Sequence, residues 1–255
     1  MLIGLNRTDE GVGLEHGGGA AAPRRCVIMA PVPARVAGLF DEGITIFEDR
    51  ASCGTEADPT SGECWPSGYA LAAELVDIAA SRGGTLAGVR LLELGCGSGV
   101  ASLAARRLGA DVVAVDASAN ALELLALAVD AQGAAPGSLA SARLDFTDEA
   151  AMAALFAEHD RFDAVVAADV LYDQKIAAGV GAALRRRCPP AALLLVDPGR
   201  THGRRRFLET FAEDFFAHVF DPVPASRQQP TFRGEPAAPS DGLGRLGVGL
   251  GALYA

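Results

Sequence analysis

The segment with the most specific chemistry is a glycine-rich turn, residues 93–99, which directly follows an apolar run. A helical pattern comes next, and then a second apolar run that ends in Asp116. Glycine has no Cβ and tolerates positive φ, so such a turn lets the main chain come very close to a ligand. A carboxylate at the end of the next strand can accept hydrogen bonds from ribose hydroxyls. The pattern predicts a site for a nucleoside-containing cofactor.

The glycine spacing separates this turn from two other nucleotide-binding loops. The dinucleotide fingerprint G-x-G-x-x-G needs a glycine three residues after its second glycine. Three residues after Gly97 the chain has Val100, and three residues after Gly95 it has Ser98, so neither glycine fits. No Gly-Lys-Ser/Thr run is present, so a P-loop is not supported. The frame is E-x-G-x-G-x-G, which disfavours a nicotinamide dinucleotide and an oxidoreductase.

This frame resembles the first motif of the seven-strand S-adenosylmethionine-dependent methyltransferases. In that family the glycines lie against the methionine part of the cofactor, and the acid at the end of the second strand binds the ribose. The resemblance therefore implies S-adenosyl-L-methionine as the cofactor. The cofactor contacts that it implies around the turn are Glu93, Gly95, Cys96, Gly97, Gly99, Asp116 and Ala117.

A second candidate site follows another apolar run, where Asp169 and Tyr172 are three residues apart. Once a helical turn begins there, both side chains face the same cleft. A carboxylate beside an aromatic ring suits an amine acceptor, because both stabilise the positive charge that grows on nitrogen. The alternative is that Asp169 caps the next helix and that Tyr172 packs on it.

The D-x-x-Y stretch resembles the motif after the fourth strand in family 16 of the seven-strand methyltransferases. That group covers protein-lysine methyltransferases and bacterial nicotinamide-N-methylase-like proteins. The resemblance implies a cofactor contact for Ala168 and an acceptor channel shaped by Asp169 and Tyr172. Residues 197–200, Asp-Pro-Gly-Arg, resemble a branch of the same family that includes the methyltransferase of lysines in the electron-transfer flavoprotein β subunit. The alternative for those four residues is a plain β-turn.

Three more residues are candidates for contact with the cofactor. Trp65 precedes a helical pattern, where similar proteins place an aromatic ring beside the methionine end, although a hydrophobic staple would also explain it. Asp145 and Phe146 follow the third predicted strand, where this fold often binds the adenine edge and stacks on its face. The alternative for Asp145 is a carboxylate at a helix start.

Composition limits the class of protein. The 255 residues suit one α/β domain with an N-terminal extension. No apolar run reaches the roughly 18 uncharged residues of a membrane span, so we expect none. The net charge of −10 disfavours a nucleic-acid partner, because it repels phosphates at long range. The arginine clusters 185–187 and 204–206 are interpreted as solvated cations at helix C-termini.

Cysteine and histidine usage points to a reducing compartment without a metal site. The five cysteines form no C-x-x-C pair, and their odd number argues against a disulfide framework. The four histidines are scattered, and His202 is the one that we would test. The N-terminus lacks the apolar region of a secretory signal. We expect a cytoplasmic protein, with mitochondria as the alternative.

The expected organisation is a flexible leader (1–25), an N-terminal β-hairpin and loop (26–62), and a methyltransferase domain (63–255). An amphipathic helix from about residue 69 has Ser67 as its expected N-cap. Strands and helices then alternate, which predicts an α/β fold with a doubly wound, mostly parallel seven-stranded sheet and a small N-terminal β extension. Expected strands are 89–94, 111–115, 140–144, 162–167, 191–196, 215–220 and, weakly, 246–250 and 253–254. Expected helices are 100–108, 119–131, 148–158, 174–187 and 204–211.

We interpret the chain as an S-adenosylmethionine-dependent N-methyltransferase whose favoured acceptor is a lysine of a protein partner. The alternative in the same class is a small nitrogen heterocycle of the nicotinamide type, which needs a closed aromatic pocket. An aromatic content of only 6% favours the open channel. A further alternative is a catalytically silent fold that serves as an interaction module, which the intact glycine turn and Asp116 disfavour.

Overall fold

The computed structural model describes residues 26–28, 38–39, 44–49, 62–159, 161–187, 192–198, 201–211, 221–222 and 244–248. The expected leader, the strands 215–220 and 253–254, and Arg200 lie outside the described residues. The strands are β1 (Cys26–Ile28), β2 (Ile46–Glu48), β3 (Arg90–Leu94), β4 (Asp111–Asp116), β5 (Ser138–Arg143), β6 (Ala164–Ala168), β7 (Ala192–Asp197), β8 (Asp221–Pro222) and β9 (Gly244–Val248). The helices are α2 (Pro66–Ser81), α3 (Val100–Arg107), α4 (Ala119–Gln132), α5 (Glu149–Glu158), α6 (Gln174–Arg187) and α7 (Thr201–Phe211).

The main sheet has seven strands in the order β5-β4-β3-β6-β7-β9-β8. The first five of these are parallel to one another, and β9 is antiparallel to both β7 and β8. The central strand β3 is buried on both faces after its first residue, as expected for a parallel sheet covered by helices. The predicted doubly wound, mostly parallel seven-stranded sheet is confirmed.

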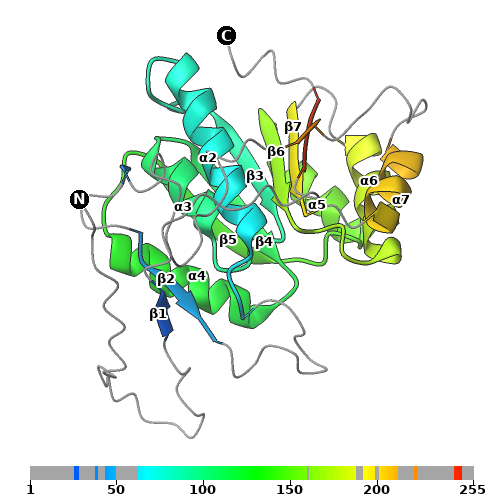
Figure 1. Ribbon diagram of the computed structural model, residues 1–255, viewed down its shortest axis with the longest axis horizontal. Coiled ribbons are helices and arrows are strands. Elements are labelled where there is room, and N and C mark those ends of the chain that lie inside the picture. The colour runs from blue at the N-terminus through cyan, green and yellow to red at the C-terminus, as the bar shows by residue number, and fades with distance from the viewer. Residues whose placement is uncertain are drawn as a thin grey trace, which may run out of the picture.

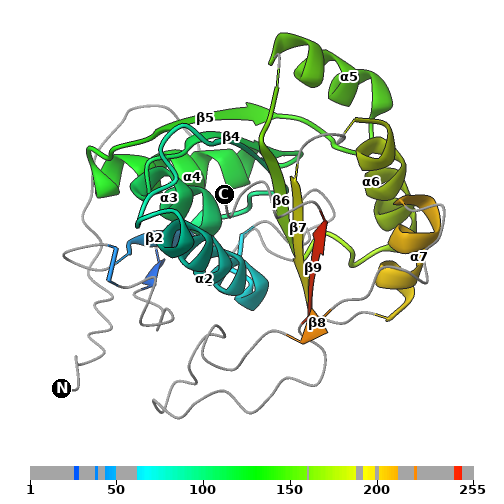
Figure 2. The ribbon, with the colours of Figure 1, turned by 90° about the horizontal axis from the view of Figure 1, so that it is seen from above.

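Two layers of helices cover the sheet. Helices α2, α3 and α4 lie on one face, and α5, α6 and α7 lie on the other (Figures 1 and 2). Each layer encloses apolar side chains that are almost completely buried, such as Leu71 and Leu91 on the first side and Leu92 and Phe207 on the second. Two apolar faces therefore hold the sheet in place, and the carboxyl ends of its strands stay accessible for a site.

The small N-terminal sheet is packed against the first helix layer. Strands β1 and β2 pair antiparallel, which agrees with the expected small N-terminal β extension. Ile46 and Phe47 belong to the same buried cluster as Tyr69 of α2 and Leu124 of α4. The side-chain amide of Gln132 also donates to the carbonyl of Thr45 (3.4 Å). The N-terminal segment is thus joined to the main core.

Two helix starts differ from the sequence predictions. Helix α2 begins at Pro66 with Trp65 as its N-cap residue, so the expected cap Ser67 is wrong. Proline is already favoured at the first helical position, which moves the start forward. Helix α7 begins at Thr201, which places Arg204 in its first half and not at a helix C-terminus. The five parallel strands agree with the predicted ones within two residues at each end.

No helix in the described ranges is both long enough and apolar enough to cross a membrane. The same part of the chain contains no cluster of three or more histidine, cysteine or acidic side chains that could hold a metal ion.

Candidate functional site

The candidate site lies where the chain reverses the direction in which it builds the sheet. From β3 the chain passes to β4 and β5 on one side, and then it crosses back to β6 on the other side of β3. The loops after β3 and β6 therefore diverge and leave a crevice at the carboxyl ends of the strands. A pocket opens to solvent at this point.

Three segments line this pocket: the turn before α2, the glycine turn with the start of α3, and the end of β6. The lining residues are Glu63, Cys64, Trp65, Gly68, Glu93, Gly95, Cys96, Gly97, Ser98, Val100, Ala101 and Ala168. Six of the residues predicted from the sequence are among them, namely Trp65, Glu93, Gly95, Cys96, Gly97 and Ala168. The other predicted residues are not among the lining residues.

The three glycines of the turn all have left-handed backbone angles, with φ of 66° at Gly95, 51° at Gly97 and 82° at Gly99. A Cβ at Gly95 would lie 2.8 Å from Cγ1 of Val170, and a Cβ at Gly99 would overlap the buried side chain of Leu125. A Cβ at Gly97 would meet no atom within 4 Å. Gly95 and Gly99 are therefore needed for packing, whereas Gly97 leaves room on the pocket side.

Asp116 connects the glycine turn to the next strand. Its Oδ2 accepts the main-chain N–H of Gly97 (2.9 Å), and its Oδ1 accepts that of Ser118 (2.9 Å). The carboxylate thus lies at the end of β4 beside the turn. An ionised carboxylate has roughly four acceptor positions, so this arrangement is compatible with ribose hydroxyls as additional donors.

Glu93 is a buried acid in the floor of the pocket. Its side chain is 2% exposed, and its Oε2 accepts the hydroxyl of Ser102. Burial raises the pKa of Glu93 from 4.5 to about 8; the Ser102 hydrogen bonds oppose this rise, and the charge of Asp116 adds to it. A protonated Glu93 is therefore favoured at neutral pH, which avoids an unpaired charge in the core.

Cys64 lies opposite the glycine turn and connects four segments. Its main-chain N–H donates to Oε1 of Glu48 on β2 (2.9 Å), and its thiol lies near the side chains of Ser98 and Tyr69. Burial raises the pKa of the Cys64 thiol to about 11. Glu48 is 3% exposed and Tyr69 is 1% exposed, so this polar cluster is almost closed to solvent. It holds the turn that carries Trp65.

Two residues that join the wall of the pocket, Cys64 and Glu48, were not predicted from the sequence. Cys64 is adjacent to Trp65, a predicted cofactor contact, and this adjacency could have indicated that Cys64 lies at the site. A lone cysteine by itself indicates no site. Glu48 is distant in sequence and belongs to no motif, so only the packed structure reveals it.

The expected acceptor residues follow β6. Asp169 is 8% exposed and has φ of 57°, the one positive φ at a non-glycine among the described residues. Tyr172 is 42% exposed. The expected helical turn at this point is wrong, because α6 begins only at Gln174. The proposed capping role of Asp169 is wrong too, since Oδ1 of Asp173 accepts the N–H groups of Lys175 and Ile176.

The residues predicted for the adenine end lie beyond the pocket lining. Phe146 is buried, and its ring would lie 3.3 Å from a Cβ at Gly95, so it packs behind the turn. Oδ1 of Asp145 accepts the N–H (2.9 Å) and the hydroxyl (2.7 Å) of Thr147. Asp145 is not the cap of α5, because that is Asp148. Ala117 is exposed next to Asp116.

The fold is similar to that of a solved methyltransferase, and weaker matches extend to other methyltransferase structures. The Thermus thermophilus 16S rRNA N2 G1207 methyltransferase, solved with AdoMet and guanosine, has a TM-score of 0.51 and 19% identity, over 74% of this chain and 44% of that one. A TehB-like S-adenosylmethionine-dependent methyltransferase from Corynebacterium glutamicum has a TM-score of 0.44 and 15% identity, over 69% and 85%. TehB from Haemophilus influenzae has a TM-score of 0.38 and 20% identity, over 49% and 40%. This chain therefore spans less than half the length of the Thermus and Haemophilus proteins.

Residues 42–214 match the family model described as lysine methyltransferase, which is more than half of the chain. The protein belongs to this family, and it shares its fold with a methyltransferase that was solved with AdoMet. No curated protein matches its sequence. The pocket at the switch point and the open space at Gly97 fit such a cofactor.

Substitution of two glycines should separate packing from ligand binding. Gly99→Ala would place a methyl group on the buried Leu125, and it should lower the free energy of unfolding by about 2–4 kcal/mol through overpacking and left-handed strain. Gly97→Ala should cost only about 1–2 kcal/mol, because its methyl group meets open space. The same methyl group should weaken S-adenosylhomocysteine binding by about tenfold or more. Urea unfolding and calorimetry measure the two effects, and unchanged affinity in Gly97→Ala would contradict the assignment.

The buried acid Glu93 should make stability depend on pH. Because its pKa is about 8 in the folded chain and 4.5 as the ordinary value, its contribution to stability is complete below pH 4.5 and is lost as the pH rises through 8. The loss is about 1.4 kcal/mol for each unit by which the two pKa values differ. Glu93→Gln keeps an acceptor for Ser102 but does not titrate, so its urea midpoint should fall less between pH 5 and pH 8. If the urea midpoints of wild type and Glu93→Gln instead change with pH in the same way, Glu93 is not protonated in the folded chain.

Proposed function

We propose that this methyltransferase modifies a lysine side chain of a protein. The observation that carries the proposal is the loop after β6, which we call the acceptor loop, residues 169–172. Ala168 lines the pocket, Asp169 follows directly in a constrained conformation, and Tyr172 is exposed. A carboxylate and an aromatic ring thus follow a pocket-lining residue closely in sequence, which supports an amine acceptor at this loop.

The chain would hold the cofactor in the pocket as follows. The glycine turn gives the main chain close access to the methionine part, and Trp65 and Cys64 form the opposite wall. Asp116 at the end of β4 would bind the ribose, and Phe146 with Asp145 would border the adenine. The cofactor supplies an electrophilic methyl group when it is bound.

The residues of the chain provide position and charge. Transfer of a methyl group needs the acceptor nitrogen to be collinear with the methyl carbon and the leaving sulfur, at roughly 3 Å, with water excluded. Asp169 would orient the lysine amine and stabilise the positive charge that develops on its nitrogen. Tyr172 would flank the methylene chain and the amine at the mouth. These roles need no metal and no nucleophilic side chain.

The exposure of Tyr172 favours a protein over a small heterocycle as substrate. Small ligands are usually bound in pockets that bury 70–90% or more of their surface. An aromatic ring that is 42% exposed in the acceptor loop suits a long side chain that enters from solvent. The family match to lysine methyltransferases supports the same substrate class.

Two aspartates should separate cofactor binding from methyl transfer. Asp116→Ala removes the acceptor for Gly97 and for the ribose, so binding of S-adenosylhomocysteine should weaken by about 100-fold or more. Asp169→Asn should bind it within about twofold of wild type but transfer methyl groups about 100-fold more slowly. The assay uses labelled S-adenosylmethionine and an extract of the source cells, followed by mass spectrometry for methyl-lysine.

The chain offers a control for this assay, because Lys175 is its single lysine. In Lys175→Arg, any methyl-lysine must lie on another protein and not on the enzyme. Label that appears only in small molecules would replace the proposal with the nicotinamide-type alternative. Tight cofactor binding without any transfer would favour a silent fold.

A further inference from the structure

The first turn of α7 supports the acceptor loop from behind. At Gly203 a Cβ would overlap the carbonyl oxygen of Leu171, so only glycine lets the helix backbone come this close. Leu171 is 1% exposed, and its neighbour Val170 is 5% exposed. The loop therefore cannot withdraw from α7 without pulling apolar side chains out of the core.

The end of β7 contacts both the loop and the helix. The carbonyl of Val196 accepts the main-chain N–H of Asp169 (2.9 Å). In the next residue, Oδ1 of Asp197 accepts Nε of Arg204 (2.6 Å), and the carbonyl oxygen of Asp197 accepts Nη2. Asp197 is 1% exposed and Arg204 is 19% exposed, so this ion pair is shielded from water. A planar guanidinium with two such bonds fixes geometry as well as charge.

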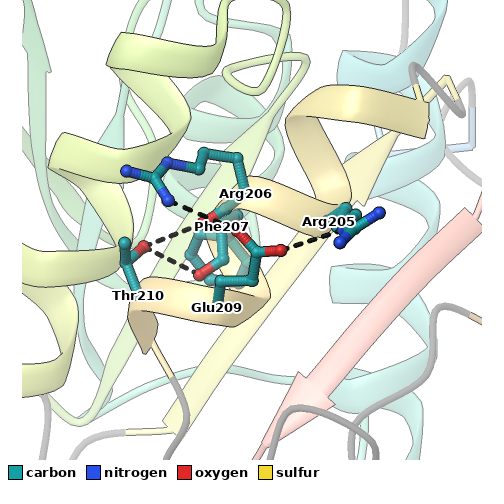
Figure 3. Close-up of polar contacts among 5 residues, drawn as sticks. All are labelled: Arg205, Arg206, Phe207, Glu209 and Thr210. Carbon is teal, nitrogen blue, oxygen red and sulfur yellow. Dashed lines mark hydrogen bonds and ion pairs between the residues drawn. The ribbon is translucent and has the colours of Figure 1, made fainter.

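The two arginines that follow are bound differently. Arg205 contacts Glu209 (2.9 Å), and Arg206 contacts the same carboxylate (3.3 Å), as Figure 3 shows. Their side chains are 72% and 49% exposed, so these pairs lie at the surface of α7. Exposed pairs of this kind contribute little to stability. Three consecutive arginines thus contain one partly buried anchor and two surface residues.

We propose that Arg204 is a positioning residue of the acceptor site. Through Asp197 it fixes the first turn of α7, and that turn supports the loop in which Asp169 keeps its left-handed backbone. Such a backbone is strained at a non-glycine residue and persists only where the surroundings hold it. The sequence motif at residues 197–200 gains a role in this way, because its aspartate binds Arg204. The inference rests on the proposed function of the acceptor loop.

The experiment compares Arg204→Met with the matched surface variant Arg205→Met in the full-length chain. Hydrogen–deuterium exchange of peptides that cover residues 169–175 should become about tenfold faster in Arg204→Met and stay unchanged in Arg205→Met. Calorimetry with S-adenosylhomocysteine should give affinities within about twofold for both. Methyl transfer should be about tenfold slower in Arg204→Met, at an unchanged KM for the cofactor. Arg204→Lys should recover part of the protection.

Arg204→Met leaves the charge of Asp197 buried without its partner, which destabilises a fold strongly. The double variant Asp197→Asn with Arg204→Gln removes both charges and serves as the second test, with the same expected exchange and transfer. Three results for Arg204→Met and the double variant would overturn the inference. Exchange of residues 169–175 could match that of Arg205→Met, or exchange could rise equally across the sheet. The affinity for S-adenosylhomocysteine could also fall by the same factor as methyl transfer. Exchange and calorimetry need no acceptor, so failure of the wild type to transfer methyl groups would refute the proposed function separately.

Discussion

Gly97 donates its main-chain N–H to the carboxylate of Asp116, and this bond ties the turn after β3 to the end of β4. The turn must pass through three left-handed residues within five positions, which only glycines do at low cost. Packing requires glycine at Gly95 and Gly99, and the hydrogen bond to Asp116 holds the main chain at Gly97. The shape of the pocket therefore depends on the carboxylate of Asp116 and on three glycines, which have no side chain.

The two sides of the pocket are built in different ways. The glycine turn is held by main-chain bonds and by Asp116, whereas the wall with Trp65 is held by a buried polar cluster around Cys64. The acids of the site also differ in charge state. Burial favours a neutral Glu93, so the floor of the pocket does not add a second negative charge close to Asp116. Glu93 can thus line the pocket without adding a negative charge to it.

The sequence predicts most of the fold because its patterns are local. Apolar runs and the glycine spacing predict the parallel strands and the pocket around Gly95 and Gly97, and these features are present. The conformation at Asp169 is not predictable from the residue type, because the contacts with Val196 and α7 override the helical tendency. The link from Glu48 to Cys64 joins segments 16 residues apart that share no motif. The partner of Asp197 is likewise selected by the tertiary position of α7, and no local rule distinguishes Arg204 from Arg205.

The hydrogen bond between Glu48 and Cys64 makes the pocket mechanically dependent on the N-terminal hairpin. Glu48 lies on a three-residue strand, and its carboxylate is the acceptor for the turn that leads to Trp65. The N-terminal strands therefore belong to the structure that shapes the pocket, even though the doubly wound sheet starts only at β3.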